Sequence, residues 1–294
     1  MRLPKRVRSG WIFILGLIMM IPLTAGQDWE ESYPVSEKST ISKSIPFADP
    51  SAARRLILDN VIGPVKVEGT NRRDVQIIVE KVIHAKSRDK IRKAEEEVRL
   101  DINAEGGEVE LYVDGPFRDN NRRRNRHRPG YVVHYGFTVQ VPKQISIDIR
   151  TATDGDIEIR NITGDFEVSH ANGKIIMTDI NGSGSAHTAN GEVKVYFTDN
   201  PAKDCSFKTV NGDVELHLRP GLSADFHLKT WHGDAYSDFE FKEFQLPIQR
   251  TVEDKDWKFV YKSTQYQGVR IGRGGPAIRM DTMNGDLIIT KNEQ

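Results

Sequence analysis

Apolar and polar residues recur with a nine-residue period in the middle of the chain. Between Gly155 and Asp199, five successive segments begin with glycine, and 13 of the 15 residues at their third, fifth and eighth positions are apolar. The third and fifth positions lie two residues apart, so their side chains point to one face of a strand. The eighth position predicts an inward side chain at a corner, after which an Asn-Gly or similar pair turns the chain. The predicted turn glycines are Gly155, Gly164, Gly173, Gly182, Gly191, Gly212, Gly233 and Gly285.

A coil of two strands and two corners explains this fixed period, whereas simple hairpins give no reason for an inward eighth position. Alternate segments then stack, which predicts one wall with the columns Ile157, Ile175, Val193, Val214 and Ile159, Met177, Val195, Leu216. The opposite wall would hold Phe166, Gly184, Cys205 and Phe226, with Ala171, Ala189, Val210 and Trp231 inward at the corner. The pattern predicts an all-β fold, a right-handed parallel β-helix with about 18–21 residues per turn.

The same pattern recurs around Gly63 and around Gly285, near the two ends of the chain. Between them, residues 131–141 alternate strictly, as in a half-buried strand. One short helix is expected around Ser87–Val98, with Ile91, Ala94 and Val98 on one side. We therefore expect a linker or edge strand at 27–50, an N-terminal β region with the helix at 51–150, and the repeat region at 151–294, interrupted by an inserted hairpin near 240–267.

The first 26 residues predict a secretion signal. Four basic residues, Arg2, Lys5, Arg6 and Arg8, precede an uncharged apolar run from Trp11 to Leu23 and the small residues Thr24, Ala25 and Gly26. This order is typical of a signal peptide that is cleaved, here near Gly26. The alternative, an uncleaved membrane anchor, is less favoured because the run is short for a bilayer. We expect export to the periplasm, the cell surface or the medium.

Charge and cysteine content narrow the class of protein further. The chain has 42 basic and 42 acidic residues, and loss of the signal peptide would leave 38 basic residues, a formal charge of −4. This balance argues against a nucleic-acid partner. Cys205 is the only cysteine, so disulfides do not stabilise the exported protein.

Several tracts resemble the bacterial putative-adhesin domain family, a family of unknown function. They are TDGDIEIRNITGDFEV, TVNGDVELHL, GRGGPAIRMDTMNGDLIITK and, near the start, LILDNVIGPVKVEG with VQIIVEKV. The resemblance extends roughly from Leu56 to Lys291. It implies a single-stranded β-helix and a location in the cell envelope, sometimes linked with stress signalling. It implies no catalytic residues.

An arginine cluster is the strongest charge feature of the sequence. It consists of Arg118, Arg122, Arg123, Arg124, Arg126 and Arg128. The planar guanidinium group suits phosphate, sulfate and carboxylate, so an anionic envelope polymer or a lipid headgroup is a candidate partner. The alternative is a solvated loop, which is the usual role of a basic run.

Acidic residues follow most turn glycines, at Asp156, Asp165, Asp213, Asp234 and Asp286, with Glu192 in the equivalent place. Glycoside hydrolysis needs two carboxylates at a defined separation. One acid per turn beside glycine is what turn chemistry alone produces, so no catalytic residue is assigned.

Other chemistry-bearing residues predict neither a metal site nor a cofactor. The repeats lack the G-G-x-G-x-D spacing of calcium-binding coils. The histidines lack the close spacing of a zinc site, and most of them fall at outward positions; they are His170, His187, His217, His227 and His232. The inward position of Cys205 is typical of a small buried residue. We therefore predict no metal and no cofactor.

The interruption at 240–267 is rich in aromatic residues, namely Phe241, Phe244, Trp257, Phe259, Tyr261 and Tyr266. Aromatic faces stack on sugar rings or contact other proteins. The alternative is that they pack an inserted hairpin against the coil.

These observations together predict an exported, non-enzymatic, envelope-associated binding or scaffolding protein. Its expected partner is an anionic envelope polymer or a surface protein, with only peripheral contact to membranes. Two other hypotheses stay open. A polysaccharide-active enzyme would need carboxylates that converge in one groove, and a signalling partner of a membrane regulator would need one specific protein ligand. The sequence does not determine the oligomeric state.

Overall fold

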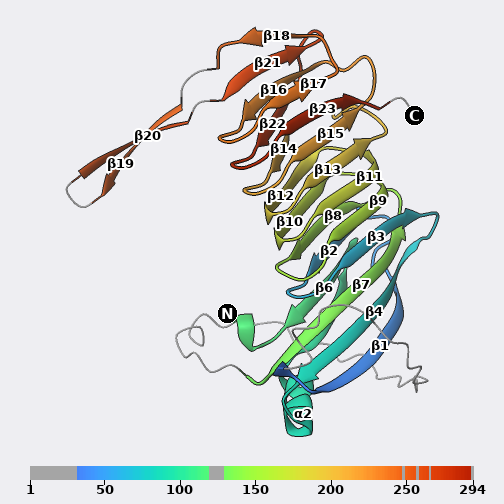
Figure 1. The fold of residues 1–294 in the computed structure, drawn as a ribbon. Coiled ribbons are helices and arrows are strands. Elements are labelled where there is room, and N and C mark those ends of the chain that lie inside the picture. Colours follow the sequence, from blue (N-terminus) through green and yellow to red (C-terminus); the bar gives the residue numbers. More distant parts are fainter. Residues whose placement is uncertain (1–31, 119–128, 247–248, 256–257, 265, 293–294) are drawn as a thin grey trace, which may run out of the picture.

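The computed structural model describes residues 32–118, 129–246, 249–255, 258–264 and 266–292. Two large mixed β-sheets face one another along the molecule, and the chain is predominantly β, as predicted (Figure 1). The first sheet has the order β1 (Val35–Pro46), β4 (Asp74–Ala85), β7 (Tyr131–Pro142), β3 (Val65–Thr70), β9 (Ile157–Thr163), β11 (Ile175–Asn181), β13 (Val193–Phe197), β15 (Val214–Leu218), β23 (Leu287–Lys291) and β17 (Ala235–Ser237).

The second sheet has the order β18 (Phe241–Phe244), β21 (Gln267–Ile271), β16 (Ala224–Lys229), β22 (Ala277–Asp281), β14 (Cys205–Lys208), β12 (Gly184–Asn190), β10 (Phe166–Asn172), β8 (Ser146–Thr151), β2 (Arg55–Asp59), β6 (Glu108–Asp114) and β5 (Arg99–Glu105). A separate hairpin of β19 (Gln249–Lys255) and β20 (Lys258–Thr264) projects away from the coil (Figure 1).

In the middle of the chain, the predicted alternation of strands is present: β8 to β15 alternate between the two sheets and pair in parallel with the turns on either side. Ile175 lies opposite both Ile157 and Val193, and Val193 lies opposite Val214. These side chains are fully buried between the sheets. The nine-residue period therefore corresponds to half a turn of the coil, one strand and one corner, and strands 18 residues apart pair with one another.

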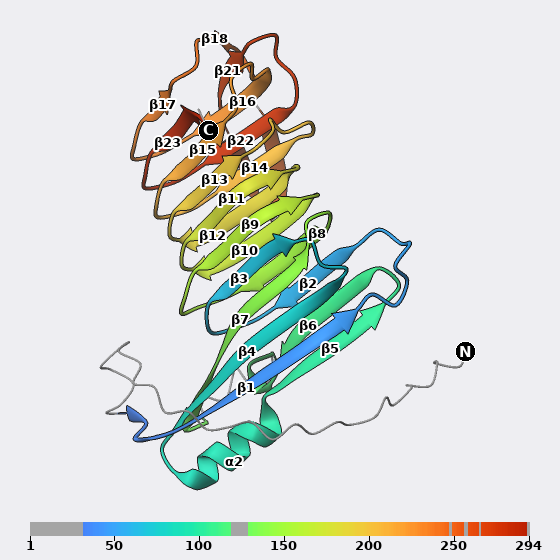
Figure 2. The ribbon, with the colours of Figure 1, turned by 90° about the vertical axis from the view of Figure 1, so that its right-hand side faces the viewer.

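The N-terminal end of the coil is closed by long antiparallel strands and a helix. Strands β1, β4 and β7 extend the first sheet, and α2 (Arg88–Glu97) lies beyond them, at the opposite end from β18 (Figure 2). The predicted helix is confirmed, since Ile91, Ala94 and Val98 are all buried. A 3-10 turn (Pro116–Arg118) follows β6.

One predicted column is wrong at the C-terminal end. Strand β22 lies between β14 and β16, so Cys205 and Phe226 both lie opposite Ile278 instead of opposite one another. Strand β23 likewise separates β15 from β17. The last repeat of the sequence carries the same inward pattern as its neighbours, so it fits between two earlier turns of the coil.

The second corner of each turn, between a strand of the second sheet and the next strand of the first sheet, also differs from prediction. Val210 and Trp231 were expected to point inward, but they are 43% and 69% exposed. The preceding residue occupies the interior instead, as in Thr209, whose Oγ1 donates to the Gly191 carbonyl at 2.8 Å. Thr188, Thr230 and Thr282 make equivalent bonds. An inward glycine carbonyl needs a donor, which an apolar side chain could not supply.

Among the described residues, no helix is both long enough and apolar enough to cross a lipid bilayer. The predicted secretion signal lies outside those residues.

Candidate binding cleft

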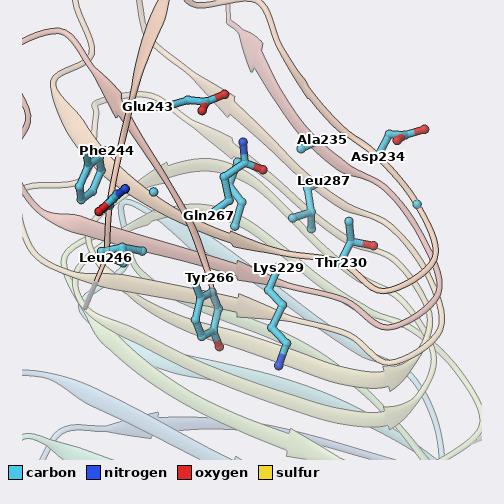
Figure 3. A pocket seen from close by; sticks show the side chains of 14 residues that line it. Lys229, Thr230, Asp234, Ala235, Glu243, Phe244, Leu246, Tyr266, Gln267 and Leu287 are labelled. Atoms are coloured by element: carbon cyan, nitrogen blue, oxygen red, sulfur yellow. The ribbon is translucent and has the colours of Figure 1, made fainter. Parts of the chain in front are cut away.

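An open cleft of about 860 Å³ lies at the C-terminal end of the coil (Figure 3). It forms because the first sheet stops at β17, while the second sheet continues through β21 and β18. Its lining consists of Leu228, Lys229, Thr230, Gly233, Asp234, Ala235, Glu243, Phe244, Gln245, Leu246, Tyr266, Gln267, Gly268 and Leu287. Cleft residues therefore come from the last turn of the coil and from both strands of its antiparallel extension.

The chemistry of the cleft is mixed. Leu228 and Leu287 are buried core residues at its base, whereas Glu243, Gln245 and Gln267 are exposed. Glu243 belongs to β18 and Asp234 to the corner before β17, and the Asp234 carboxylate points away from Glu243 (Figure 3). Such a surface offers an apolar base with amide and carboxylate groups around it, which is typical of a binding site.

Tyr266 is held at one side of the cleft by its hydroxyl group. That group donates to Asp281 Oδ2 at 2.8 Å, and the Lys229 ammonium lies 5.6 Å from the centre of the ring. Burial, followed by the bond to Asp281, raises the pKa of Tyr266 to about 12. The phenol is therefore protonated at neutral pH and acts as a donor, not as a base.

Three rings meet on the outer face of the second sheet beside the cleft. The His227 ring lies 6.4 Å from Phe244 and 6.5 Å from Tyr266. Gly268 leaves room for this cluster, since a Cβ there would stand 3.1 Å from the Phe244 ring. The Arg270 guanidinium lies 5.2 Å from the centre of the same ring. Aromatic faces and cations are thus combined on one surface.

Arg270 owes its position to a carboxylate. It donates twice to Asp225, at 2.7 and 2.8 Å, in a bidentate pair. This interaction is the main reason why the pKa of Asp225 lies below its ordinary value. The pair holds the guanidinium close to the Phe244 ring.

Of the predicted arginine cluster, the structure describes Arg118 alone. Arg118 donates to Asp59 Oδ1 at 2.7 Å and to the Val113 carbonyl, and it lies 4.6 Å from the centre of the Tyr112 ring. These contacts tie β6 to β2. Arg122, Arg123, Arg124, Arg126 and Arg128 lie outside the described residues, so anion binding by the cluster stays a prediction.

Three of the six corner acids accept a backbone amide of the neighbouring turn. Asp156 accepts from the Lys174 amide, Asp213 from the Asp286 amide and Asp286 from the Asp234 amide, all at 2.8–2.9 Å. Asp165 instead pairs with Lys203, and Glu192 with Lys194. These contacts are those of turn chemistry between stacked strands.

The turn glycines make close contacts along the coil. Gly155, Gly164, Gly173, Gly191, Gly212, Gly233 and Gly285 all have positive φ angles. Gly182 differs, because its φ angle is not positive; a Cβ there would stand 2.0 Å from the Gly164 carbonyl oxygen. Close approach of successive turns, as well as φ, therefore requires glycine.

His170 and Cys205 are both buried in the coil. His170 was expected to point outward, but it is buried and its Nε2 lies 2.7 Å from the Gly155 carbonyl oxygen. Cys205 is buried, and burial raises the pKa of its thiol. Within the described residues, no group of three or more His, Cys, Asp or Glu side chains could hold a metal ion.

Acidification below pH 6.5 is expected to destabilise the protein through His187 and His134. Burial, the largest cause in each, lowers both pKa values from 6.5. As pH falls through 6.5, the unfolded chain takes up protons that the folded chain does not, so the free energy of unfolding decreases until the folded pKa values are passed. Urea titrations from pH 7.5 to 5 would measure this decrease.

His187→Gln should reduce that decrease, whereas His232→Gln, at an exposed corner, should leave it unchanged. Asp74 and Asp225 have pKa values below 3.8, so their protonation changes the free energy of unfolding only at lower pH. Constant stability across this range would contradict the prediction.

Sequence reasoning missed most of the cleft. Phe244 and Tyr266 were singled out by their aromaticity, but Lys229, Glu243 and Gln267 were not. Nothing in the local pattern marks them, because the cleft depends on where the first sheet ends.

Comparison with known proteins agrees with the resemblance seen in the sequence. Residues 143–260 match the Toastrack DUF4097 family. This match confirms the likeness to the putative-adhesin domain family, whose function is unknown, over these residues. No curated protein matches this chain.

Three solved structures are similar to this chain, each at 12% sequence identity. A putative cell adhesion protein from Clostridium sporogenes has a TM-score of 0.37, covering 87% of this chain and 100% of its own. A putative adhesin from Bacteroides fragilis has a TM-score of 0.36, covering 86% and 97%. A putative lipid binding protein from Parabacteroides distasonis has a TM-score of 0.27, covering 88% and 97%.

Proposed function

We propose that this protein is an exported, non-enzymatic binding or scaffolding module of the cell envelope, of the putative-adhesin type. The secretion signal predicted for residues 1–26 supports export, to the periplasm or the cell surface. The match to the Toastrack DUF4097 family supports the comparison with adhesin domains. Contact with membranes would be peripheral.

The ring cluster beside the cleft is the observation that carries this proposal. Phe244, His227 and Tyr266 present aromatic surface, and Lys229 is part of the cleft lining. Sugar rings stack on such surfaces, while amides such as Gln267 bind hydroxyl groups. Lys229 and the exposed Arg279 add positive charge on the same sheet. An envelope glycan that carries acidic groups fits this combination best.

The positions of the corner acids favour binding over hydrolysis. Asp156, Asp213 and Asp286 each use one oxygen to hold the amide of the neighbouring turn. A glycosidase needs two carboxylates that face a bound sugar from opposite sides. In the cleft, Asp234 points away from Glu243 (Figure 3). A polysaccharide-active enzyme is therefore the weaker hypothesis.

We also propose that the coil is right-handed. Crossovers between parallel strands of one sheet are right-handed in about 98% of cases, because the strand twist favours that hand.

Co-sedimentation of the purified protein with envelope fractions and with polyanionic glycans tests the proposal. We expect binding that weakens as salt is raised, because part of it is electrostatic. Phe244→Ala combined with Lys229→Gln should weaken binding about tenfold, the loss expected when one hot-spot contact is removed. Tyr196→Ala, on the opposite sheet, is the matched aromatic control.

A second variant replaces the five arginines from Arg122 to Arg128 with glutamine. Loss of binding in this variant alone would move the polymer site to the arginine cluster. Released oligosaccharide in the supernatant would overturn the non-enzymatic assignment. Absence of any binding would favour a protein partner.

A further inference from the structure

The second corner repeats a five-residue motif, and only its copy at 230–234 contributes residues to the cleft lining, namely Thr230, Gly233 and Asp234. Each turn contributes a Thr or His, which is buried in all copies but that of Thr230, then an outward apolar residue, Asn or His, Gly and, in most turns, an acid. The five copies are HANGK (170–174), TANGE (188–192), TVNGD (209–213), TMNGD (282–286) and TWHGD (230–234), in their spatial order. The outward apolar residue grows from alanine to tryptophan toward the C-terminal end of the coil.

Three of these apolar side chains form an exposed row. Val210, Met283 and Trp231 are 43%, 46% and 69% exposed. They occupy successive turns, because Asn211 bridges to Asn284 and Asn284 bridges to His232. Tryptophan and methionine are enriched at the centres of protein interfaces, where truncating such anchors costs most.

Hydrogen bonds between successive turns hold the corner in place. Asn284 Nδ2 donates to Asn211 Oδ1, and Asn211 Nδ2 donates to Asn190 Oδ1, both at 2.6 Å. The buried Thr282 and Thr209 fix the backbone beneath them. A partner would therefore meet a surface that is already ordered, which lowers the entropic cost of binding.

A row of negative charge runs beside the apolar row. Asp213, Asp286 and Asp234 stand three positions after Val210, Met283 and Trp231 on the same turns. In the part of the chain that the structure describes, no ion pair joins a Lys, Arg or His to any of them, whereas Glu192 on the preceding turn pairs with Lys194. The charges of Asp234 and Asp286 raise the pKa of the neighbouring Tyr236.

We propose that Val210, Met283 and Trp231, with Asp213, Asp286 and Asp234, form a docking surface for a basic amphipathic helix of a protein partner. Successive turns of the coil are about 4.8 Å apart. Helix turns rise about 5.4 Å each, so residues at i, i+4 and i+7 match three successive turns. Lysine or arginine on the adjoining helix face would meet the three carboxylates. A second copy of this chain is a poorer occupant, because its acid row would face this one.

The test uses the full chain and a synthetic helix of about 18 residues, or five turns, with leucine on one face and lysine on the other. A peptide with glutamate in place of lysine is the charge control. Fluorescence anisotropy should show saturable binding of the lysine peptide, weakened by salt, and none of the glutamate peptide.

Two sets of variants make the result specific to this corner. Trp231→Ala should weaken binding about tenfold, as for an interface hot spot. The triple variant Asp213→Asn, Asp286→Asn and Asp234→Asn should do the same. At positions 213 and 286 the new side-chain amide keeps an oxygen that accepts the backbone N–H of the neighbouring turn. Ile78→Ala removes a comparably exposed apolar residue elsewhere and should bind as the unaltered chain does. Thermal melts check that all variants fold.

Equal binding of both peptides would overturn the proposal, as would affinity unchanged in Trp231→Ala and in the triple variant. Sedimentation velocity of the unaltered chain shows whether it forms a dimer. A dimer that Trp231→Ala dissociates would assign the surface to a second copy and overturn the proposal.

Discussion

Replacement of Val195 with aspartate is expected to unfold the protein at room temperature. Val195 is fully buried and lies opposite Met177 on one turn and Leu216 on the other. An aspartate there would place an unpaired charge among apolar side chains, at a cost of several kcal/mol. Domains of this kind are stable by about 5–15 kcal/mol in total. Circular dichroism during urea unfolding would measure the loss.

Val210→Asp is the matched control for that experiment. It makes the same substitution in the same coil, but at a side chain that is 43% exposed. We expect the stability to change by less than about 0.5 kcal/mol, as for most surface substitutions. Equal destabilisation by both variants would mean that Val210 points inward, against the structure. A normal melt of Val195→Asp would contradict the coil itself.

Gly212→Ala is expected to be the second strongly destabilising substitution. Its φ angle is 144°, and a Cβ would stand 2.2 Å from the carbonyl oxygen of Gly191 on the neighbouring turn. Backbone strain alone costs about 1–3 kcal/mol. Separation of the two turns would add lost strand pairing, so we expect at least about 3 kcal/mol, measured by the same urea titration.

Gly221→Ala separates strain from crowding. Gly221 also has a positive φ angle, 82°, but no heavy atom lies within 4 Å of the position of its Cβ. The free energy of unfolding of this variant should fall only by the conformational cost, about 1–2 kcal/mol. If the two alanine variants are equally stable, the close approach of successive turns does not require glycine.

Periodicity predicted the rungs of the fold correctly because burial acts on each strand locally. Ile157, Ile175 and Val193 alternate with polar neighbours, and each alternation alone indicates which face of its strand is buried. The helix at α2 could be predicted for the same reason, from the spacing of Ile91 and Ala94. The corner was predicted wrongly because it is governed by a hydrogen bond between turns. Thr209 turns inward to satisfy the Gly191 carbonyl, and Val210 is left outside.

What the sequence by itself determined is the repeating unit: strands with one apolar face, glycine turns, and a core without disulfides. Only the tertiary structure decided the order of the units. The turn formed by β2 and β3 lies between those of β6–β7 and β8–β9, and the turn of β22 and β23 lies between β14–β15 and β16–β17. Turns with the same inward pattern can pair with one another in several orders, so the local pattern does not indicate which order forms. The cleft and the charged corner exist only in the order that the fold selects.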